Sequence, residues 1–368
     1  MRRVISACTA ATAAVVLAAT PALAREGKKP LPPAESTITT GLVTPLSLAE
    51  GPRGTTLVSQ NFAGLLTSVA PDGTPTVLYA SEDGAEVGAV SYDHGVVTFA
   101  ETGATQTVKQ LRLDRDGMPQ GEPRTIADVG AFEERRNPDA KVTYGFRDIR
   151  RSCLDQLPEE LRPQYQGIVE SHPYATTSAV GVTFVADAAA NSILSVDWRG
   201  TVRTVAVLPA QPVRITAEIA AGQGLPECVV GKDYWFEPVP TDVEIGPWGQ
   251  LYVTTLPGGP EDDSLGARGA VHTVSPFTGK VRTVATGLLS PTGLAVDVRG
   301  TVYVAELFGG QVSTPARKGP QAVVTVPLPG DVEITSKGLL ATTNVLPPDE
   351  TSPPDGHLVR YTLDRSRH

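Results

Sequence analysis

Apolar and polar positions along this chain repeat in a unit of about sixteen residues, and the unit occurs six times. In the two clearest copies, residues 240–255 and 291–306, β-branched and aromatic positions lie on both sides of a glycine, and the copies align without a gap. Glycine accepts a positive φ at a turn and β-branched residues favour strands, so each copy predicts two antiparallel strands. The other copies begin at Pro45, Glu86 and Pro329, with a copy one residue shorter at Pro173.

A third and a fourth strand are expected after each unit. Residues 64–69 and 191–196 alternate between apolar and polar, and second turns such as Thr278-Gly279 lead into runs such as 281–285. Four antiparallel strands repeated every roughly 40–50 residues are typical of a β-propeller. We predict an all-β chain that forms a six-bladed β-propeller, with blades at about 41–81, 83–130, 172–209, 238–287, 288–327 and 328–368.

The sixth blade shows only three clear strands, the last of them at 358–362. An alternating run at 36–40, near the other end of the chain, is a candidate for the fourth strand. Pairing of these two segments would leave no exposed strand edge between the last blade and the first. We therefore expect 36–40 to lie beside 358–362 and to close the ring.

Two long insertions interrupt the repeat, at about 130–171 and about 209–238. Apolar residues spaced three and four apart predict one amphipathic helix at 147–161. A second, short helix is expected at 216–221, where Gly222 would stop it.

The insertions and two other loops are expected to share one face of the propeller. Both insertions lead into the first strand of a blade, and the loops at 256–269 and 344–356 connect second strands to third strands. These connections emerge on the same side because neighbouring antiparallel strands alternate in direction. We predict that this face presents a binding surface. Variation in tolerant surface loops is the alternative explanation.

The N-terminus has the pattern of a signal peptide. Arg2 and Arg3 precede a largely apolar run at 10–19, and residues 22–24 form a small-x-small cleavage site. No other stretch approaches the roughly 20 apolar residues that a membrane helix needs. We therefore predict a secreted chain with a signal peptide at 1–24, a proline-rich leader and closing strand at 25–40, and a propeller at 41–368.

Charge and cysteine usage narrow the expected partners and the compartment. The chain has 31 basic and 40 acidic residues and a net charge of −9. Phosphate backbones demand basic patches, so we do not expect nucleic acid as a partner, and we expect a monomer. Cys153 and Cys228 remain after cleavage, one in each insertion. In an exported chain they are expected to form one disulfide bond, with two buried free thiols as the alternative.

The sequence contains no strong catalytic motif and leaves open whether the protein is an enzyme. Polar residues nevertheless gather where first strands begin, where second strands end and in the loops beside them. We predict a ligand-binding site from Asp242, Arg268, Glu306, His172, Glu101 and Asp187. Asp242 and Asp331 are also candidate ligands for calcium, which takes six to eight oxygens. The alternative is that the carboxylates cap strand-end amides and that His172 is packed and hydrogen-bonded.

Five segments resemble the ScyD/ScyE family, which is named after two proteins of a scytonemin pigment cluster. They are SHPY at 171–174, GLPEC at 224–228, FEPVPTDV at 236–243, TTLPGGPE at 254–261 and VAELFGG at 304–310. The repeats are also similar to the looser NHL and gluconolactonase-like six-bladed group. The resemblance implies a secreted propeller, but the family has no defined activity, so no catalytic residue is carried over.

We hypothesise that the protein is an extracytoplasmic propeller that binds an unidentified small molecule or protein partner on its looped face. The alternative is a metal-dependent, lactonase-like hydrolase in which an axial calcium-type cation polarises a substrate carbonyl. Gluconolactonase-like enzymes take several Glu, Asn and Asp ligands from the starts of first strands. Gly88 and Gly293 occupy two of those places here, which argues against the hydrolase.

Overall fold

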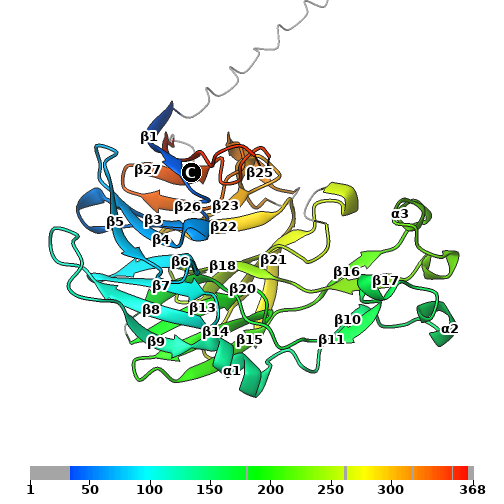
Figure 1. The fold of residues 1–368 in the computed structure, drawn as a ribbon. Helices are drawn as coiled ribbons and strands as arrows, with labels where there is room; N and C mark the ends of the chain where they lie inside the picture. The colour runs from blue at the N-terminus through cyan, green and yellow to red at the C-terminus, as the bar shows by residue number, and fades with distance from the viewer. Residues whose placement is uncertain (1–33, 180, 261–262, 317–318, 350, 364–368) are drawn as a thin grey trace, which may run out of the picture. The chain divides into compact units, whose positions relative to one another are not determined.

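The computed structural model describes residues 34–179, 181–260, 263–316, 319–349 and 351–363 (Figure 1). The predicted signal peptide and residues 25–33 of the leader lie outside this part of the chain. Within it the protein is all-β, with seven four-stranded antiparallel sheets and a few short helices.

Five of the sheets are each built from four consecutive strands. The first contains β2 (Leu48–Glu50), β3 (Thr56–Gln60), β4 (Leu65–Val69) and β5 (Pro75–Ala80). The second contains β6 (Glu86–Asp93), β7 (Val96–Thr102), β8 (Gln106–Arg112) and β9 (Arg124–Asp128). The third contains β12 (Pro173–Ala179), β13 (Val182–Asp187), β14 (Ser192–Asp197) and β15 (Val202–Val207). The fourth contains β18 (Pro240–Ile245), β19 (Leu251–Thr255), β20 (Gly269–Val274) and β21 (Val281–Leu288). The fifth contains β22 (Pro291–Val296), β23 (Val302–Glu306), β24 (Gln311–Thr314) and β25 (Gln321–Thr325).

The sixth sheet joins the two ends of the described chain. It contains β26 (Val332–Thr335), β27 (Gly338–Thr343), β28 (Gly356–Thr362) and, beside β28, β1 (Ala34–Leu42). Ser36 pairs with Arg360 and Thr37 with Val359, so the predicted pairing of 36–40 with 358–362 is confirmed. In Figure 1 the blue strand β1 lies beside the C-terminal strands, shown in orange and red. These six sheets are called the repeat sheets below.

Two features of the repeat sheets follow directly from the sixteen-residue unit. The turn glycines adopt the positive φ that the pattern requires, for example 76° at Gly249 and 85° at Gly300. Every residue of the second strands β19 and β23 is buried, because their apolar side chains pack on both faces. The first strands lie next to one another in the order β2, β6, β12, β18, β22, β26 and again β2.

The seventh sheet, called the insertion sheet below, was not predicted. It is built from both insertions and has the order β11 (Gln164–Gln166), β10 (Thr143–Phe146), β17 (Asp233–Phe236) and β16 (Gln211–Arg214). Gly145 pairs with Trp235 and Phe146 with Tyr234 across the two insertions. Figure 1 shows the four strands side by side. The sequence predicted no strand at these positions, because each strand has only three or four residues, too few for alternation to be recognised.

The predicted helix at 147–161 was wrong. Only one turn, α2 (Arg151–Leu154), is α-helical there, followed by a 3-10 turn at Glu159–Leu161. Pro158 stops the helix because proline has no N–H to donate and disfavours helical geometry at Leu157 before it.

Two other helices accompany the insertions. The short helix predicted at 216–221 is confirmed as α3 (Ala217–Gly222), where the Thr216 hydroxyl accepts a hydrogen bond from the N–H of Ile219. The helix α1 (Val129–Arg136), at the root of the first insertion, was not predicted.

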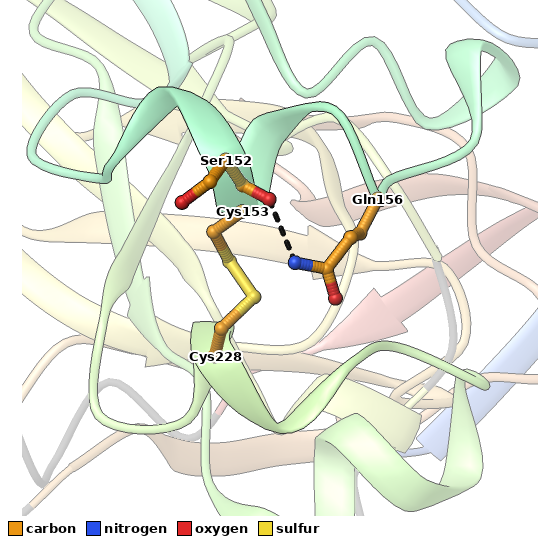
Figure 2. The surroundings of a disulfide bond; sticks show 4 residues. All are labelled: Ser152, Cys153, Gln156 and Cys228. Atoms are coloured by element: carbon orange, nitrogen blue, oxygen red, sulfur yellow. Dashed lines mark hydrogen bonds between the residues drawn. A yellow bond between two sulfur atoms is a disulfide. The ribbon is translucent and has the colours of Figure 1, made fainter.

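The predicted disulfide bond is confirmed and joins the two insertions (Figure 2). Cys153, in α2, is bonded to Cys228, and their Cα atoms are 6.0 Å apart. The side chain of Gln156 donates a 2.7 Å hydrogen bond to the carbonyl of Ser152 in the same turn (Figure 2). Cys153 is buried in a small apolar cluster with residues of both insertions, including Phe146, Val229 and Tyr234. The bond therefore adds a covalent link to a core that both insertions build.

Candidate functional site

A pocket of about 540 Å³, called the insertion pocket below, lies where three separate segments of the chain meet. The first insertion contributes Phe146 and five residues between 158 and 165, and the second contributes residues between 215 and 237. The third wall comes from the loop between β19 and β20, through Gly258, Gly259 and Pro260. Both insertions and one of the two predicted long loops therefore line the same cavity.

Aromatic side chains dominate the wall that the insertion sheet provides. Tyr234 and Phe236 project to the same side of β17, because side chains two residues apart in a strand share a face. Their rings are 4.6 Å apart, and Phe146 meets Tyr234 edge-on at 5.1 Å. The pocket wall is thus a packed aromatic cluster whose side chains are fixed by one another.

A few polar groups complete the pocket. The Tyr234 hydroxyl donates to the carbonyl oxygens of Leu161 and Arg162, at 2.9 and 3.1 Å, and ties the 3-10 turn to β17. Burial raises the pKa of Glu237. Hydrogen bonds from Tyr165 and Asn191 lower the pKa, but they do not outweigh burial. The exposed guanidinium of Arg162 lies 5.8 Å from the centre of the Tyr165 ring. The cavity therefore combines apolar rings with two acidic residues, Glu160 and Glu237, and one cation, Arg162.

Arg268, a predicted site residue, supports the loop wall of this pocket. Its guanidinium donates to the carbonyl oxygens of Gly258 at 3.0 Å and Pro260 at 2.7 Å, and it lies 4.7 Å from the centre of the Phe236 ring. Gly259 has a φ of 89°, and a Cβ there would come within 2.5 Å of the Phe236 ring. Arg268 and Gly259 together hold the loop close against the aromatic wall.

Asp242 and Asp331, the predicted calcium ligands, each join two neighbouring first strands. Asp242 in β18 accepts hydrogen bonds from the N–H of Leu294 in β22, at 2.5 Å, and from its neighbour Val243. Asp331 accepts from the N–H of Leu48, at 2.8 Å, and of Val332. These contacts match the alternative in which the carboxylates cap strand amides.

The surroundings of these two carboxylates are acidic. Burial raises the pKa of Asp242 to about 7 and that of Asp331 well above its usual range, and the charge of Asp242 adds to the effect on Asp331. Burial and neighbouring carboxylates also raise the pKa of Glu244 and Glu333 on the same first strands. In the described part of the chain no group of three or more His, Cys, Asp or Glu side chains is arranged to hold a metal ion.

Glu306 is almost completely buried and fully engaged at the end of β23. Its carboxylate accepts hydrogen bonds from the N–H of Leu289 at 2.7 Å and from the side chains of Gln311 and Ser313. The contacts of Arg268, Asp242 and Glu306 therefore belong to three different networks. Their grouping around one pocket stays a prediction.

Glu101 lies in a separate place, on the border of a polar pocket of about 700 Å³ between the first two repeat sheets. It accepts hydrogen bonds from Lys109, at 2.8 Å, and from the Tyr79 hydroxyl. Burial opposes ionisation, but these two donors outweigh it and lower the pKa of Glu101.

His172 and Asp187 are brought together just before β12. The Asp187 carboxylate is fully buried and accepts from the N–H of His172, at 2.7 Å, and from the Ser171 hydroxyl, at 2.6 Å. The His172 ring contacts Glu86 at 3.1 Å, and Glu86 accepts from Asn61. Burial opposes protonation, but the Glu86 contact outweighs it and raises the pKa of His172. Both predicted residues thus take part in a hydrogen-bonded network that joins neighbouring repeat sheets.

The aromatic residues of the insertion pocket were missed from the sequence. The one signal that could have indicated them is the run Tyr234-Trp235-Phe236 inside the second insertion, since adjacent aromatics favour a strand. Their partners Phe146 and Tyr165 come from the other insertion, and nothing in the sequence links the two segments.

No protein-family model matches the chain, and no curated protein sequence is significantly similar to it. Solved structures do match. The PQQ-bound aldose sugar dehydrogenase from Streptomyces coelicolor has a TM-score of 0.52 and 15% identity over 90% of this chain and 99% of that one. A putative oxidoreductase (glucose dehydrogenase) from Thermus thermophilus gives 0.52 and 15% over 89% and 99%. A protein of unknown function from Bacteroides thetaiotaomicron gives 0.51 and 13% over 90% and 76%.

These neighbours are β-propellers, and at such low identity the likeness concerns the fold alone. The chain therefore has an all-β fold of the β-propeller kind. Among the described helices, none has the length and apolar character needed to cross a membrane.

Proposed function

We propose that the six repeat sheets are the blades of a six-bladed β-propeller and that the chain is exported after removal of residues 1–24. The ring order of the first strands, from β2 to β26 and back to β2, supports the number of blades. The signal-peptide pattern and the Cys153–Cys228 disulfide support export. Membership of the ScyD/ScyE family is part of this proposal and rests on the resembling segments alone.

We propose further that the protein binds a small ring-containing ligand in the insertion pocket. The observation that carries the proposal is the meeting of both insertions and the β19–β20 loop around one cavity lined by aromatic side chains. Its volume of about 540 Å³ falls within the range of roughly 300–1,000 Å³ found for small-molecule sites. A cavity of this size favours a small molecule over a protein partner as the ligand.

The polar groups of the pocket narrow the class of ligand. Glu237 is half-buried and presents an acceptor beside Tyr165, whereas Arg162 supplies a positive charge at the exposed edge. A planar apolar ring would pack on Tyr234 and Phe236. We expect a ligand with an aromatic or alicyclic body, a hydroxyl or amine that donates to Glu237, and an anionic group near Arg162.

Binding is favoured over the lactonase-like alternative. An axial cation would need free carboxylate oxygens from the first strands. Asp242 and Asp331 each accept two backbone hydrogen bonds instead, which hold neighbouring first strands together.

A fluorescent aromatic anion, anilinonaphthalenesulfonate, tests the pocket because it combines a ring system with one negative charge. We expect Tyr165→Ala and Arg162→Ala to weaken its binding to the folded protein about tenfold or more, as judged by fluorescence titration. Phe277→Ala is the matched control, since Phe277 is an exposed aromatic residue in a turn of the fourth repeat sheet. Unchanged affinity in both pocket variants, with folding verified by circular dichroism, would rule out this site.

A further inference from the structure

A second group of buried polar atoms lies at the root of the first insertion, outside the insertion pocket. Glu133, on the inner side of α1, is 1% exposed, and Asp139, just beyond the helix, is fully buried. Neither oxygen of the Glu133 carboxylate has a hydrogen-bond partner among the described residues, and the same holds for Oδ1 of Asp139 and Oδ1 of Asn137. Four buried oxygens within seven consecutive residues are thus left without a donor.

Such an arrangement is unfavourable for a folded protein unless something else satisfies it. A buried carboxylate without a partner loses its hydration and gains nothing in return. Burial, together with the charges of Asp187 and Asp139, raises the pKa of Glu133 to about 8, so like charges are gathered around it. Protonation of Glu133 would remove one charge but would leave the buried oxygens of Asp139 and Asn137 unpaired.

The other atoms of the group are firmly positioned. Oδ2 of Asp139 accepts from the Tyr144 hydroxyl at 2.8 Å and from the Asn191 amide at 2.9 Å, and the Asn137 amide donates to the carbonyl of Gly167 at 3.0 Å. These bonds leave the Oδ1 atoms of Asp139 and Asn137 as the unpaired ones.

Gly167 packs closely against the unpaired Asp139 oxygen. A Cβ at this position would come within 2.0 Å of Oδ1 of Asp139, so any other residue would collide with that oxygen. The side chains are therefore held in place, and Oδ1 of Asp139 is buried without a hydrogen-bond donor.

We propose that Glu133, Asp139 and Asn137 form a binding site for a calcium ion. Carboxylate and amide oxygens are the ligands that this hard cation prefers, and a site without sulfur or imidazole disfavours zinc. The site has two carboxylates rather than three, so the remaining ligands are backbone carbonyls or water. It is distinct from the first-strand acids Asp242 and Asp331.

The position of the site suggests what the ion does. Asp139 is hydrogen-bonded to Tyr144 in β10 of the insertion sheet and to Asn191 in the turn after β13 of the third repeat sheet. A cation between α1 and this carboxylate would fix the first insertion to the repeat sheets. The ion would bind near α1, where the first insertion begins, and not at the turn α2 that carries the disulfide bond.

Calcium titration of the full chain after chelator treatment tests the proposal. We expect calcium at a hundredfold excess over its Kd to raise Tm by about 3 °C, because a ligand that binds only the folded state stabilises it. Terbium, a luminescent substitute for calcium, should bind and be sensitised by Tyr144, whose hydroxyl bonds to Asp139. No effect of calcium on Tm together with no terbium signal in the wild-type chain would overturn the proposal and indicate buried water or a proton instead.

Three variants locate the site. Glu133→Gln should weaken calcium binding at least tenfold, and without calcium its Tm should not fall below that of the chelated wild-type chain, because the Glu133 carboxylate has no hydrogen bond to lose. Glu134→Gln, at the exposed neighbouring position, should bind as the wild-type chain does. Asp242→Asn should also keep calcium binding. Loss of binding in Asp242→Asn with retention in Glu133→Gln would place the ion at the first strands and reject the site proposed here.

Discussion

The repeat sheets and the insertion sheet have the same four-stranded antiparallel form but are assembled in different ways. In five of the repeat sheets, each strand pairs with the next one along the chain. The insertion sheet instead pairs Phe146 with Tyr234, and all four strands of the third repeat sheet lie between these two residues in the sequence. Closing so long a loop costs more chain entropy than a hairpin does. The same secondary structure therefore has local support in one region, whereas in the other a covalent bond joins the two segments that form it.

The two regions also differ in how their cores are shared. One apolar cluster contains residues of both the third and the fourth repeat sheets, such as Phe184 and Val253, so neighbouring repeat sheets stabilise one another. The cluster around Cys153 is drawn from the two insertions alone. A region with its own small core can open without the rest of the protein. We expect the insertion sheet to be the less stable of the two.

The largest effect should come from paired core deletions. Phe99→Ala in the second repeat sheet and Phe146→Ala in the insertion sheet remove the same side chain from positions that are 0% and 1% exposed. Each should cost about 3–5 kcal/mol locally. Phe99→Ala should lower the global free energy of unfolding in urea by that amount, whereas Phe146→Ala should mainly increase hydrogen exchange in the insertion sheet. Equal loss of global stability in both variants would show that the two regions unfold together.

Removal of the disulfide should have the next largest effect. The bond closes a loop with a sequence separation of 75, which corresponds to about 4 kcal/mol in the chain-entropy model. We expect Cys153→Ser with Cys228→Ser to open the insertion sheet and to abolish probe binding in the insertion pocket, with exchange in β7 and β23 unchanged. Mass spectrometry after deuterium labelling measures both regions at once. Protection of 143–146 and 233–236 equal to that of the wild-type chain would contradict the distinction drawn here.

A pH effect is expected from one buried histidine of the repeat sheets. His272 in β20 is 1% exposed, and burial lowers its pKa from 6.5 to about 4. As pH falls below 6.5 the unfolded chain binds this proton first, so the stabilising effect of the neutral ring is present above pH 6.5 and lost progressively down to about pH 4. The loss amounts to about 3 kcal/mol.

The matching experiment compares urea unfolding at several pH values in His272→Gln and in the wild-type chain. The variant should show a smaller decrease in stability between pH 6.5 and 4. His94→Gln serves as the control because the side chain of His94 is 84% exposed. If the free energy of unfolding of His272→Gln fell with pH as steeply as that of the wild-type chain, other groups would cause the acid sensitivity.

The smallest effect on stability is expected at Arg268. Its guanidinium holds the β19–β20 loop through the carbonyl oxygens of Gly258 and Pro260, which lie in the pocket wall. Arg268→Ala should weaken anilinonaphthalenesulfonate binding several-fold, because the loop no longer rests on Phe236, while the free energy of unfolding changes by less than about 1 kcal/mol. If Arg268→Ala unfolded the protein, its role would be structural and its place in the predicted site would be lost.

The sequence alone determined the repeat sheets. Strand pairs such as β18 with β19 and β22 with β23 could be predicted because both strands and their turn glycine lie within sixteen residues and repeat. The pairing of β1 with β28 could be predicted because the sixth predicted blade showed only three strands and the alternating run at 36–40 belonged to no other blade. The Cys153–Cys228 bond could be predicted because two cysteines allow only one intramolecular pairing.

Only the tertiary structure decided the insertion sheet, its pocket and the polar group at Glu133. Each depends on residues from segments that have no shared pattern, such as Phe146 with Tyr234 and Asp139 with Asn191. The predicted carboxylates were chosen by their place on the strands, and the sequence could not show that Asp242 would accept the N–H of Leu294 in the next sheet. The periodicity of the sequence indicates on which face of a strand a residue lies. Which residues contact that face depends on the packing of sheets and loops that are far apart in the chain.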